Sequence, residues 1–169
     1  MKQLLMKTQN EDKDREFSQL IDRYDKLIAK VCYFYAVDAD DFYDLRQESL
    51  INLWRGFDSF RGSSSLSTWV YRVCLNSCVS FFRKNHRKTS SVPIEQLPDI
   101  IAPDAGKAEL MREMYGLINR LNRQEKALVL LWLDQRSYDE IADIMGVPRN
   151  TVASRLRRVK EKLVKYSNE

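Results

Sequence analysis

The segment from Ser137 to Leu163 constrains the fold most, because it carries the start and stop signals of two successive helices. Its first residue is followed three positions later by Glu140, a capping-box pattern that predicts a helix beginning at the next residue. Gly146 stands where a left-handed residue would end that helix, and Pro148, which has no N–H to lose, suits the start of the next one. The segment therefore predicts two helices joined by a fixed turn.

The second of these helices has one apolar and one basic face. Its apolar residues step by four, three and four positions: Val152, Leu156, Val159 and Leu163. Residues 149–169 contain seven Lys or Arg against two acidic residues, a local charge of +5. This geometry is that of a helix-turn-helix, whose second helix enters the major groove of DNA. A solvated basic face on an ordinary helical hairpin is the alternative, but the capping box, the glycine turn and the two-sided helix together favour DNA binding.

The rest of the chain predicts an all-α protein of two small helical domains. Only five of the 169 residues are glycine, and no run alternates between apolar and polar residues. Helical periodicity begins near Phe17, after a polar start expected to fray, and recurs from Phe42 and from Leu66 to about His86. Three prolines then interrupt any helix. We predict domains at 1–88 and 107–169, joined by a flexible linker at 89–106.

Charge is distributed unevenly in the first of these domains. Residues 38–60 carry six acidic and two basic side chains, whereas 61–88 carry six basic and no acidic ones. The acidic and amide side chains Asp41, Asp44, Gln47, Glu48 and Asn52 are expected on the outward face of one helix. Solubility alone could explain such a face, and a basic partner is the other interpretation.

Several function classes are disfavoured. No apolar stretch approaches bilayer length and the first residues do not form a secretion signal, so we expect a cytoplasmic protein without membrane insertion. Cys74 and Cys78 lie one helical turn apart, but no further ligand completes a metal site, so buried reduced thiols are the better interpretation for them and for Cys32. His86 has no evident carboxylate partner. We expect no catalytic residue, no cofactor and no metal.

A metal-dependent nucleic-acid enzyme is another function that the sequence could support. Its ligands would be the four clustered aspartates Asp38, Asp40, Asp41 and Asp44. These positions match a helix entry and an outer helix face, and no general base accompanies them.

The helix-turn-helix segment resembles a known family. Residues 138–148, followed by Thr151-Val, Ser154-Arg155-Leu156 and Arg158, are similar to the promoter-reading segment of sigma-70-type transcription initiation factors, closest to their extracytoplasmic-function (ECF) group. The resemblance implies minus-35 contacts by Arg149, Asn150, Thr151, Ala153, Ser154, Arg155, Arg157 and Arg158. Arg155 and Arg158 are expected largely on phosphates. Ala153 departs from the Lys or Arg common there and suits an apolar contact with a thymine methyl.

The acidic helix resembles the region-two helix of the same family. The resemblance rests on the run Asp44-Leu-Arg-Gln-Glu48, with Leu50 and Trp54 after it, and Leu50 stands where many members have phenylalanine. It implies binding to the clamp helices of the largest polymerase subunit by Asp41, Asp44, Leu45, Gln47, Glu48 and Asn52.

The basic helix resembles the segment that opens DNA at the minus-10 element. The similar positions are Trp69, Arg72, Asn76, Arg83 and Lys84. The resemblance implies minus-10 contacts by Phe60, Arg61, Ser65, Thr68, Trp69, Arg72, Asn76, Arg83 and Lys84, with an extruded base held near the loop at 60–65. Trp69 and Tyr71 could instead be core aromatics, which for Trp69 is the favoured interpretation.

Together these resemblances imply a transcription initiation factor. Its partners would be core RNA polymerase, through the clamp helices and flap, promoter DNA, and an anti-sigma factor. A stand-alone helix-turn-helix regulator is the alternative.

Overall fold

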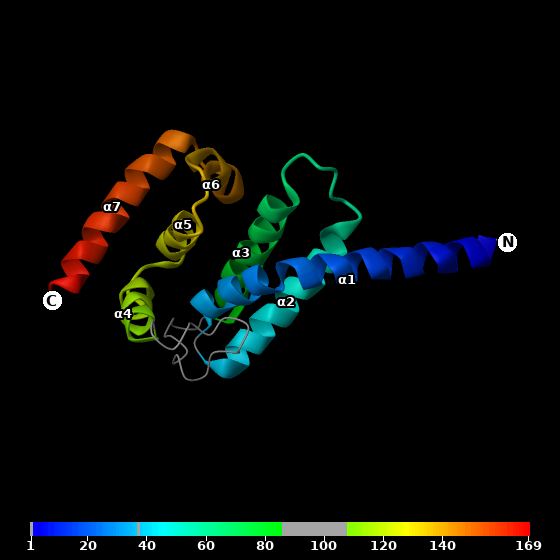
Figure 1. Ribbon diagram of the computed structural model, residues 1–169, viewed down its shortest axis with the longest axis horizontal. Helices are drawn as coiled ribbons and strands as arrows, with labels where there is room; N and C mark the ends of the chain where they lie inside the picture. The colour runs from blue at the N-terminus through cyan, green and yellow to red at the C-terminus, as the bar shows by residue number, and fades with distance from the viewer. Residues whose placement is uncertain (1, 37, 86–107) are drawn as a thin grey trace.

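The computed structural model describes residues 2–36, 38–85 and 108–169, and every regular element in these ranges is a helix (Figure 1). The helices are α1 (Lys2–Tyr35), α2 (Ala39–Phe57), α3 (Leu66–Asn85), α4 (Ala108–Asn119), α5 (Arg123–Leu133), α6 (Tyr138–Met145) and α7 (Arg149–Ser167). The predicted all-α fold is confirmed over the described residues.

Helices α1, α2 and α3 pack on one another as an N-terminal bundle (Figure 1). Helix α1 begins at Lys2, so the frayed start expected over residues 1 to about 14 is wrong for residues 2–14. The reason lies in the sequence, which has no glycine or proline before Gly56 and therefore nothing to end the helix early. Cys32, Cys74 and Cys78 lie buried in this bundle as free thiols, as predicted.

Helix α2 begins with a side-chain cap. Asp38 Oδ1 accepts the backbone N–H of Asp41 at 2.8 Å, which satisfies one of the orphan donors of the first turn. The side chain of Asp41 is only 1% exposed, so its expected place on the outward face is wrong. Asp41 lies four residues before Leu45, which is fully buried, and the two therefore share one helical face.

Helices α4 to α7 form a C-terminal bundle in which α7 packs on α4, α5 and α6. The capping box predicted at Ser137 with Glu140 is present, and a second capping box forms at Asn122 with Glu125. Gly146 ends α6 with φ 65°, the left-handed conformation predicted for it. Three apolar residues of α7 are buried beneath its basic face: Val152, Leu156 and Val159.

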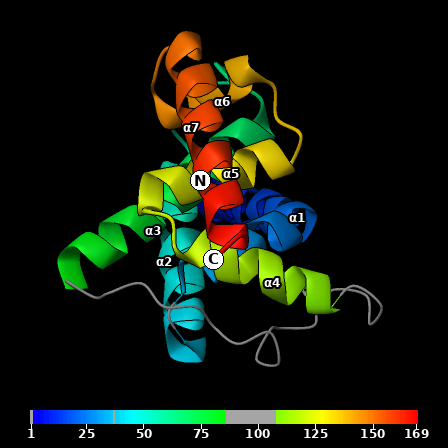
Figure 2. The same cartoon turned by 90° about the vertical axis from the view of Figure 1, so that its left-hand side faces the viewer.

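The two bundles are packed against each other. Helix α6 lies on α3 and α5 lies on α1, as the two views show (Figures 1 and 2). The predicted linker at 89–106 and His86 lie outside the described residues, so the domain boundaries stay a prediction. None of the helices in the described ranges is long and apolar enough to cross a membrane.

Candidate nucleic-acid and polymerase interfaces

The polar face of α7 is open to solvent. The side chains of Arg149 and Arg157 are 60% and 76% exposed. Their acidic neighbours, Asp139 at 3.3 Å and Glu161 at 3.9 Å, are exposed as well, so these ion pairs hold the arginines weakly. Asn150, Ser154, Arg155 and Arg158 are also exposed, whereas Thr151 and Ala153 are half-buried. The face can therefore meet an anionic surface without first breaking strong contacts.

The predicted polymerase-binding face of α2 is exposed in part. Asp44 and Gln47 are exposed and Glu48 is half-buried. Asn52 is instead held by a hydrogen bond within the bundle, since its Nδ2 donates to Ser77 Oγ on α3 at 3.0 Å. Leu45 and Asp41 are buried and lie beneath this face. Of the six predicted residues, the structure brings Asp44, Gln47 and Glu48 together on the surface.

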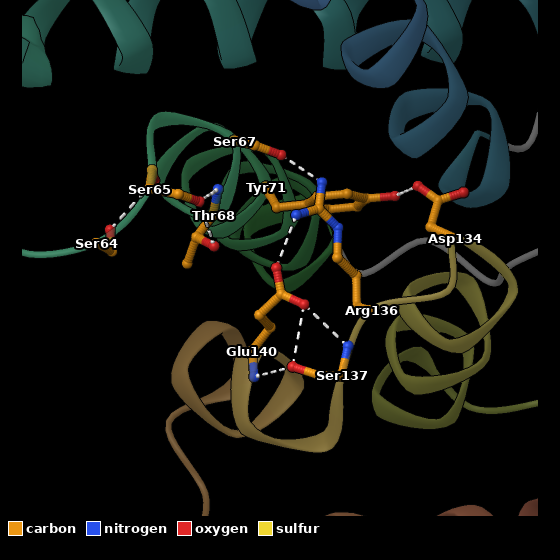
Figure 3. Close-up of polar contacts among 9 residues, drawn as sticks. All are labelled: Ser64, Ser65, Ser67, Thr68, Tyr71, Asp134, Arg136, Ser137 and Glu140. Carbon is orange, nitrogen blue, oxygen red and sulfur yellow. Dashed lines mark hydrogen bonds and ion pairs between the residues drawn. The ribbon is translucent and has the colours of Figure 1, made fainter.

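The start of α3 uses two predicted minus-10 residues for its own cap. Ser65 Oγ accepts the backbone N–H of Thr68 at 3.1 Å and donates to Thr68 Oγ1 at 2.9 Å (Figure 3). Thr68, also implied as a minus-10 contact, is 3% exposed, so the structure does not bring it to the surface with Asn76. Its position at the capped helix start turns it inward.

Trp69 is half-buried and packs on the ring of Phe60, with ring centroids 5.3 Å apart. A Cβ added at Gly56 would lie 3.2 Å from the same indole. These contacts fit the core-aromatic interpretation. The ring contact also positions Phe60, which belongs to the loop at 60–65, against Trp69. Arg61 and Arg83 are exposed, while the side chain of Lys84 lies outside the described residues.

Arg72 and Asn76, one turn apart on α3, have different surroundings. Asn76 is exposed, and it borders a shallow pocket of about 270 Å³ with Asn52, Ser77 and Ser80. Arg72 Nη2 donates to the backbone carbonyl of Asp143 on α6 at 2.8 Å. A predicted DNA-binding arginine is thus engaged by the helix-turn-helix itself.

Further contacts between the bundles converge on the turn after α5 (Figure 3). Arg136 pairs with Glu140 at 3.1 Å, donates to Ser67 Oγ, and lies over the ring of Tyr71 at 5.2 Å. The Tyr71 hydroxyl donates to Asp134 Oδ2, and Lys30 pairs with Asp134 Oδ1. Nothing in the sequence pattern singles out these residues beyond their being aromatic or charged.

Burial and hydrogen bonds shift several pKa values here. The backbone N–H of Ser137, held in the capping box, lowers the pKa of Glu140, and Arg136 adds to the effect. Burial, and next the hydrogen bond to Asp134, raises the pKa of Tyr71. Burial lowers the pKa of Lys126 to about 8, with Arg123 nearby adding to the shift. Glu140 is thereby held ionised and Tyr71 protonated near neutral pH, which preserves their hydrogen bonds.

Comparison with known proteins covers both bundles. Residues 20–88 match the family Sigma-70 region 2, and residues 111–163 match Sigma-70, region 4. The chain is 32% identical to an ECF RNA polymerase sigma-E factor of Haemophilus influenzae over 172 residues, which cover 94% of this chain and 90% of that protein. It is 31% identical to the ECF RNA polymerase sigma-E factor of Escherichia coli, with the same coverage of each chain. This chain belongs to the ECF group of sigma-70 factors.

Two solved structures share the fold of this sigma factor. The sigma factor RpoE, in complex with the anti-sigma factor NepR from Bartonella quintana, superposes with a TM-score of 0.73 at 22% identity, covering 89% of this chain and 96% of that one. CnrH, in complex with the cytosolic domain of CnrY, gives 0.66 at 21% identity, covering 92% and 89%.

As a sigma factor, the chain directs RNA polymerase to promoters. Its region 2 match contains α2 and α3, and its region 4 match contains α5, α6 and most of α7.

Proposed function

We propose that this sigma factor binds core RNA polymerase through the outward part of the α2 face, formed by the exposed Asp44 and Gln47 and the half-buried Glu48. Two carboxylates and an amide, spaced one turn apart on a helix, present acceptors to a basic partner helix. Asp41 and Leu45, buried beneath them, hold the helix in place rather than contact the polymerase. The observation that carries the proposal is the solvent exposure of this acidic face on a helix whose other side is core.

We propose two DNA-binding faces, on α7 and on α3, from the same kind of observation, the side chains that each helix offers to a partner. On α7 the exposed arginines Arg149, Arg155, Arg157 and Arg158 suit minus-35 DNA, with Asn150 and Ser154 as further hydrogen-bonding groups. On α3, Arg72, Asn76 and Arg83 suit the minus-10 strand, with the loop carrying Phe60 and Arg61 beside them.

The partners and boundaries are part of the proposal. The fold neighbours RpoE and CnrH were solved with NepR and CnrY, and we expect an anti-sigma factor to bind this chain as well. Its domains are 1–88 and 107–169, joined by a linker at 89–106. It acts in the cytoplasm, where promoter DNA and the polymerase are, and performs no catalytic step of its own.

The polymerase contact is tested by charge reversal. Asp44→Arg with Glu48→Arg should weaken binding to purified core RNA polymerase at least about tenfold, because like-charge juxtaposition across an interface costs several kcal/mol. Glu16→Arg, an exposed charge reversal on α1 outside the proposed face, serves as the control. Both variants should keep the helical circular-dichroism spectrum of the parent.

Run-off transcription from a randomised promoter library with the same core enzyme gives the functional readout. Unchanged polymerase binding by the double variant would remove the α2 face from the proposal. Specific promoter binding by the chain without polymerase would indicate a stand-alone regulator instead.

A further inference from the structure

The loop that joins α2 to α3, residues 58–65, is fixed at its α3 end. Ser65 caps the start of α3, and the ring of Phe60 packs on Trp69 with ring centroids 5.3 Å apart. Gly62 has φ 72°, a left-handed conformation that glycine adopts readily. A loop that already has its bound shape gives up less conformational entropy when it accepts a base. The contacts that hold the α2 end of the 58–65 loop therefore bear on base binding.

The α2 end of the 58–65 loop is held by Lys13 of α1. Figure 1 shows α1 passing the end of α2 and continuing beyond it. At this point Lys13 Nζ donates to Asp58 Oδ2 at 2.5 Å. Asp58 ends α2, and its backbone carbonyl accepts from the Arg61 guanidinium within the loop. The side chain and the carbonyl of one residue thus connect α1 to the loop.

Aromatic side chains hold Lys13 in this position. Its Nζ lies 4.1 Å from the centroid of the Trp54 ring, which is a cation–π contact. Phe17, one turn further along α1, packs edge-on against both Trp54 and Phe57, with ring centroids 5.0 and 5.6 Å apart. The Lys13 side chain is only 22% exposed. Its ammonium group is therefore held against the end of α2, whereas an ordinary surface lysine moves freely in water.

A pocket of about 440 Å³ lies between α1 and the 58–65 loop. Three of its lining residues belong to α1 and three to the end of α2 and the loop: Asp12, Lys13, Glu16, Phe57, Asp58 and Phe60. Phe60 belongs both to this pocket and to the stack on Trp69. A shift of Asp58 away from Lys13 would therefore change the pocket and the position of Phe60 together.

We propose that Lys13 is a positioning residue for the minus-10 element, because it holds Asp58, and with it the 58–65 loop, in the shape that accepts the extruded base. This role rests on the proposed function, which assigns the loop to the minus-10 strand. Lys13 acts through Asp58 and does not contact the base. The ion pair adds little to folding stability, since Asp58 is 70% exposed and water screens the pair. Its loss should therefore loosen the loop without unfolding the bundle.

Lys13→Met tests this proposal, because it keeps an unbranched side chain and removes the charge. Holoenzyme, formed from the full chain and core RNA polymerase, is titrated with single-stranded oligonucleotides of the non-template minus-10 sequence selected from the promoter library. One oligonucleotide is complete, and each of the others has an abasic site at one position. Lys13→Met should bind the complete oligonucleotide about fivefold more weakly, the effect expected when a partly exposed ion pair and a cation–π contact are lost. An abasic site at the extruded position should remove this difference, because no base is left for the loop to hold.

Three further variants make the result specific. Lys13→Arg keeps a cation that can reach both Asp58 and Trp54, so it should bind like the parent. Asp58→Asn cuts the same contact from the loop side and should add no further base-dependent loss to Lys13→Met, because the two residues act as one unit. Lys26→Met removes an exposed lysine roughly 20 Å further along the same helix, at about 1.5 Å per residue, and controls for the loss of one positive charge. Melting curves identify a variant that fails to fold, and if Lys13→Met does, Asp58→Asn alone takes its place.

The outcomes separate the role of Lys13 from the proposed function. A base-dependent loss in Lys13→Met that is absent in Lys13→Arg supports the positioning role. An equal loss on the complete oligonucleotide and on every abasic one overturns it and assigns Lys13 to general attraction of the strand. Unchanged binding by Lys13→Met, or the same loss in Lys26→Met, overturns it as well. If the parent itself loses no affinity at any abasic position, the loop holds no base, and the proposed minus-10 function of this loop fails together with the role of Lys13.

Discussion

Arg157 of α7 is proposed to read a base of the minus-35 element. Its side chain is 76% exposed, and its one ion-pair partner in the described structure, Glu161, lies 3.9 Å away and is equally open to water. Such a pair contributes little, so the guanidinium can turn onto the edge of a guanine at small cost. Arg157→Ala should weaken binding of the holoenzyme to its preferred minus-35 sequence by about 1 to 3 kcal/mol. Competitive selection from a randomised minus-35 library measures this loss.

The pattern of affinity loss across sequences distinguishes base reading by Arg157 from nonspecific attraction to phosphates. If Arg157 reads a base, the variant loses preference at one position of the selected sequence. Lys165→Ala, which removes an exposed cation near the end of the same helix, should leave the preference unchanged. A loss of equal size on every sequence would assign Arg157 to the phosphates instead.

On α3, substitutions of Asn76 and Thr68 should have different effects, although the family resemblance implies a minus-10 contact for both. Asn76 is exposed, so Asn76→Ala should slow promoter opening, measured by permanganate reactivity of unpaired thymines, without lowering the melting temperature. Thr68 is buried and accepts from Ser65 Oγ, so Thr68→Val should cost about 1 kcal/mol of stability. Equal opening defects at matched stability in both variants would show that Thr68 reaches DNA after all.

At the scale of elements, the α6–α7 turn depends on one backbone conformation. Gly146 has φ 65°, and a Cβ there would meet no atom within 4 Å, so an added methyl group causes backbone strain alone. Gly146→Ala should therefore destabilise the chain by about 1 to 2 kcal/mol, visible as a lower melting temperature. Gly146→Asn should cost less, because asparagine tolerates the left-handed region. Identical melting temperatures for the three proteins would mean that the turn relaxes into another conformation.

The starts of α5 and α6 could be predicted because the signals are local. A capping box needs a hydrogen-bonding side chain and an acidic one three residues later, and both boxes form at Asn122 and Ser137 as the sequence indicates. The outward face of α2 was harder to predict. A carboxylate is usually exposed, and this expectation placed Asp41 outward although its spacing from Leu45 puts it on the buried side.

The docking of the bundles could not be predicted from sequence. Tyr71 and Asp134 are 63 positions apart, and Lys30 and Asp134 are 104 apart. No periodicity connects positions so distant, and each of these residue types is also common on solvated surfaces. The contact depends on how two finished bundles meet, so only the three-dimensional arrangement reveals which carboxylate the cation and the tyrosine share.

At the scale of the whole molecule, Lys126 links docking to pH. Its side chain is 1% exposed, and its Nζ donates to the Phe34 carbonyl of α1 and to Asn119 Oδ1 of α4. Burial first, and Arg123 second, lower its pKa from 10.5 to about 8. Between these values the folded chain binds fewer protons than the unfolded chain, so its stability rises with pH across this window. Below pH 8 the lysine is protonated in both states and the full cost of burying its charge remains.

Lys126→Met isolates this effect, because methionine fills similar space without a charge. The free energy of unfolding of the parent, minus that of the variant, should increase by about 2 kcal/mol between pH 7.5 and 9.5. The buried thiols of Cys74 and Cys78 have raised pKa values because of burial, and they favour the opposite trend above pH 9. They are present in both proteins, so the subtraction removes their contribution. Parallel pH profiles for the two proteins would show that water reaches Lys126 and keeps it charged while the bundles remain docked.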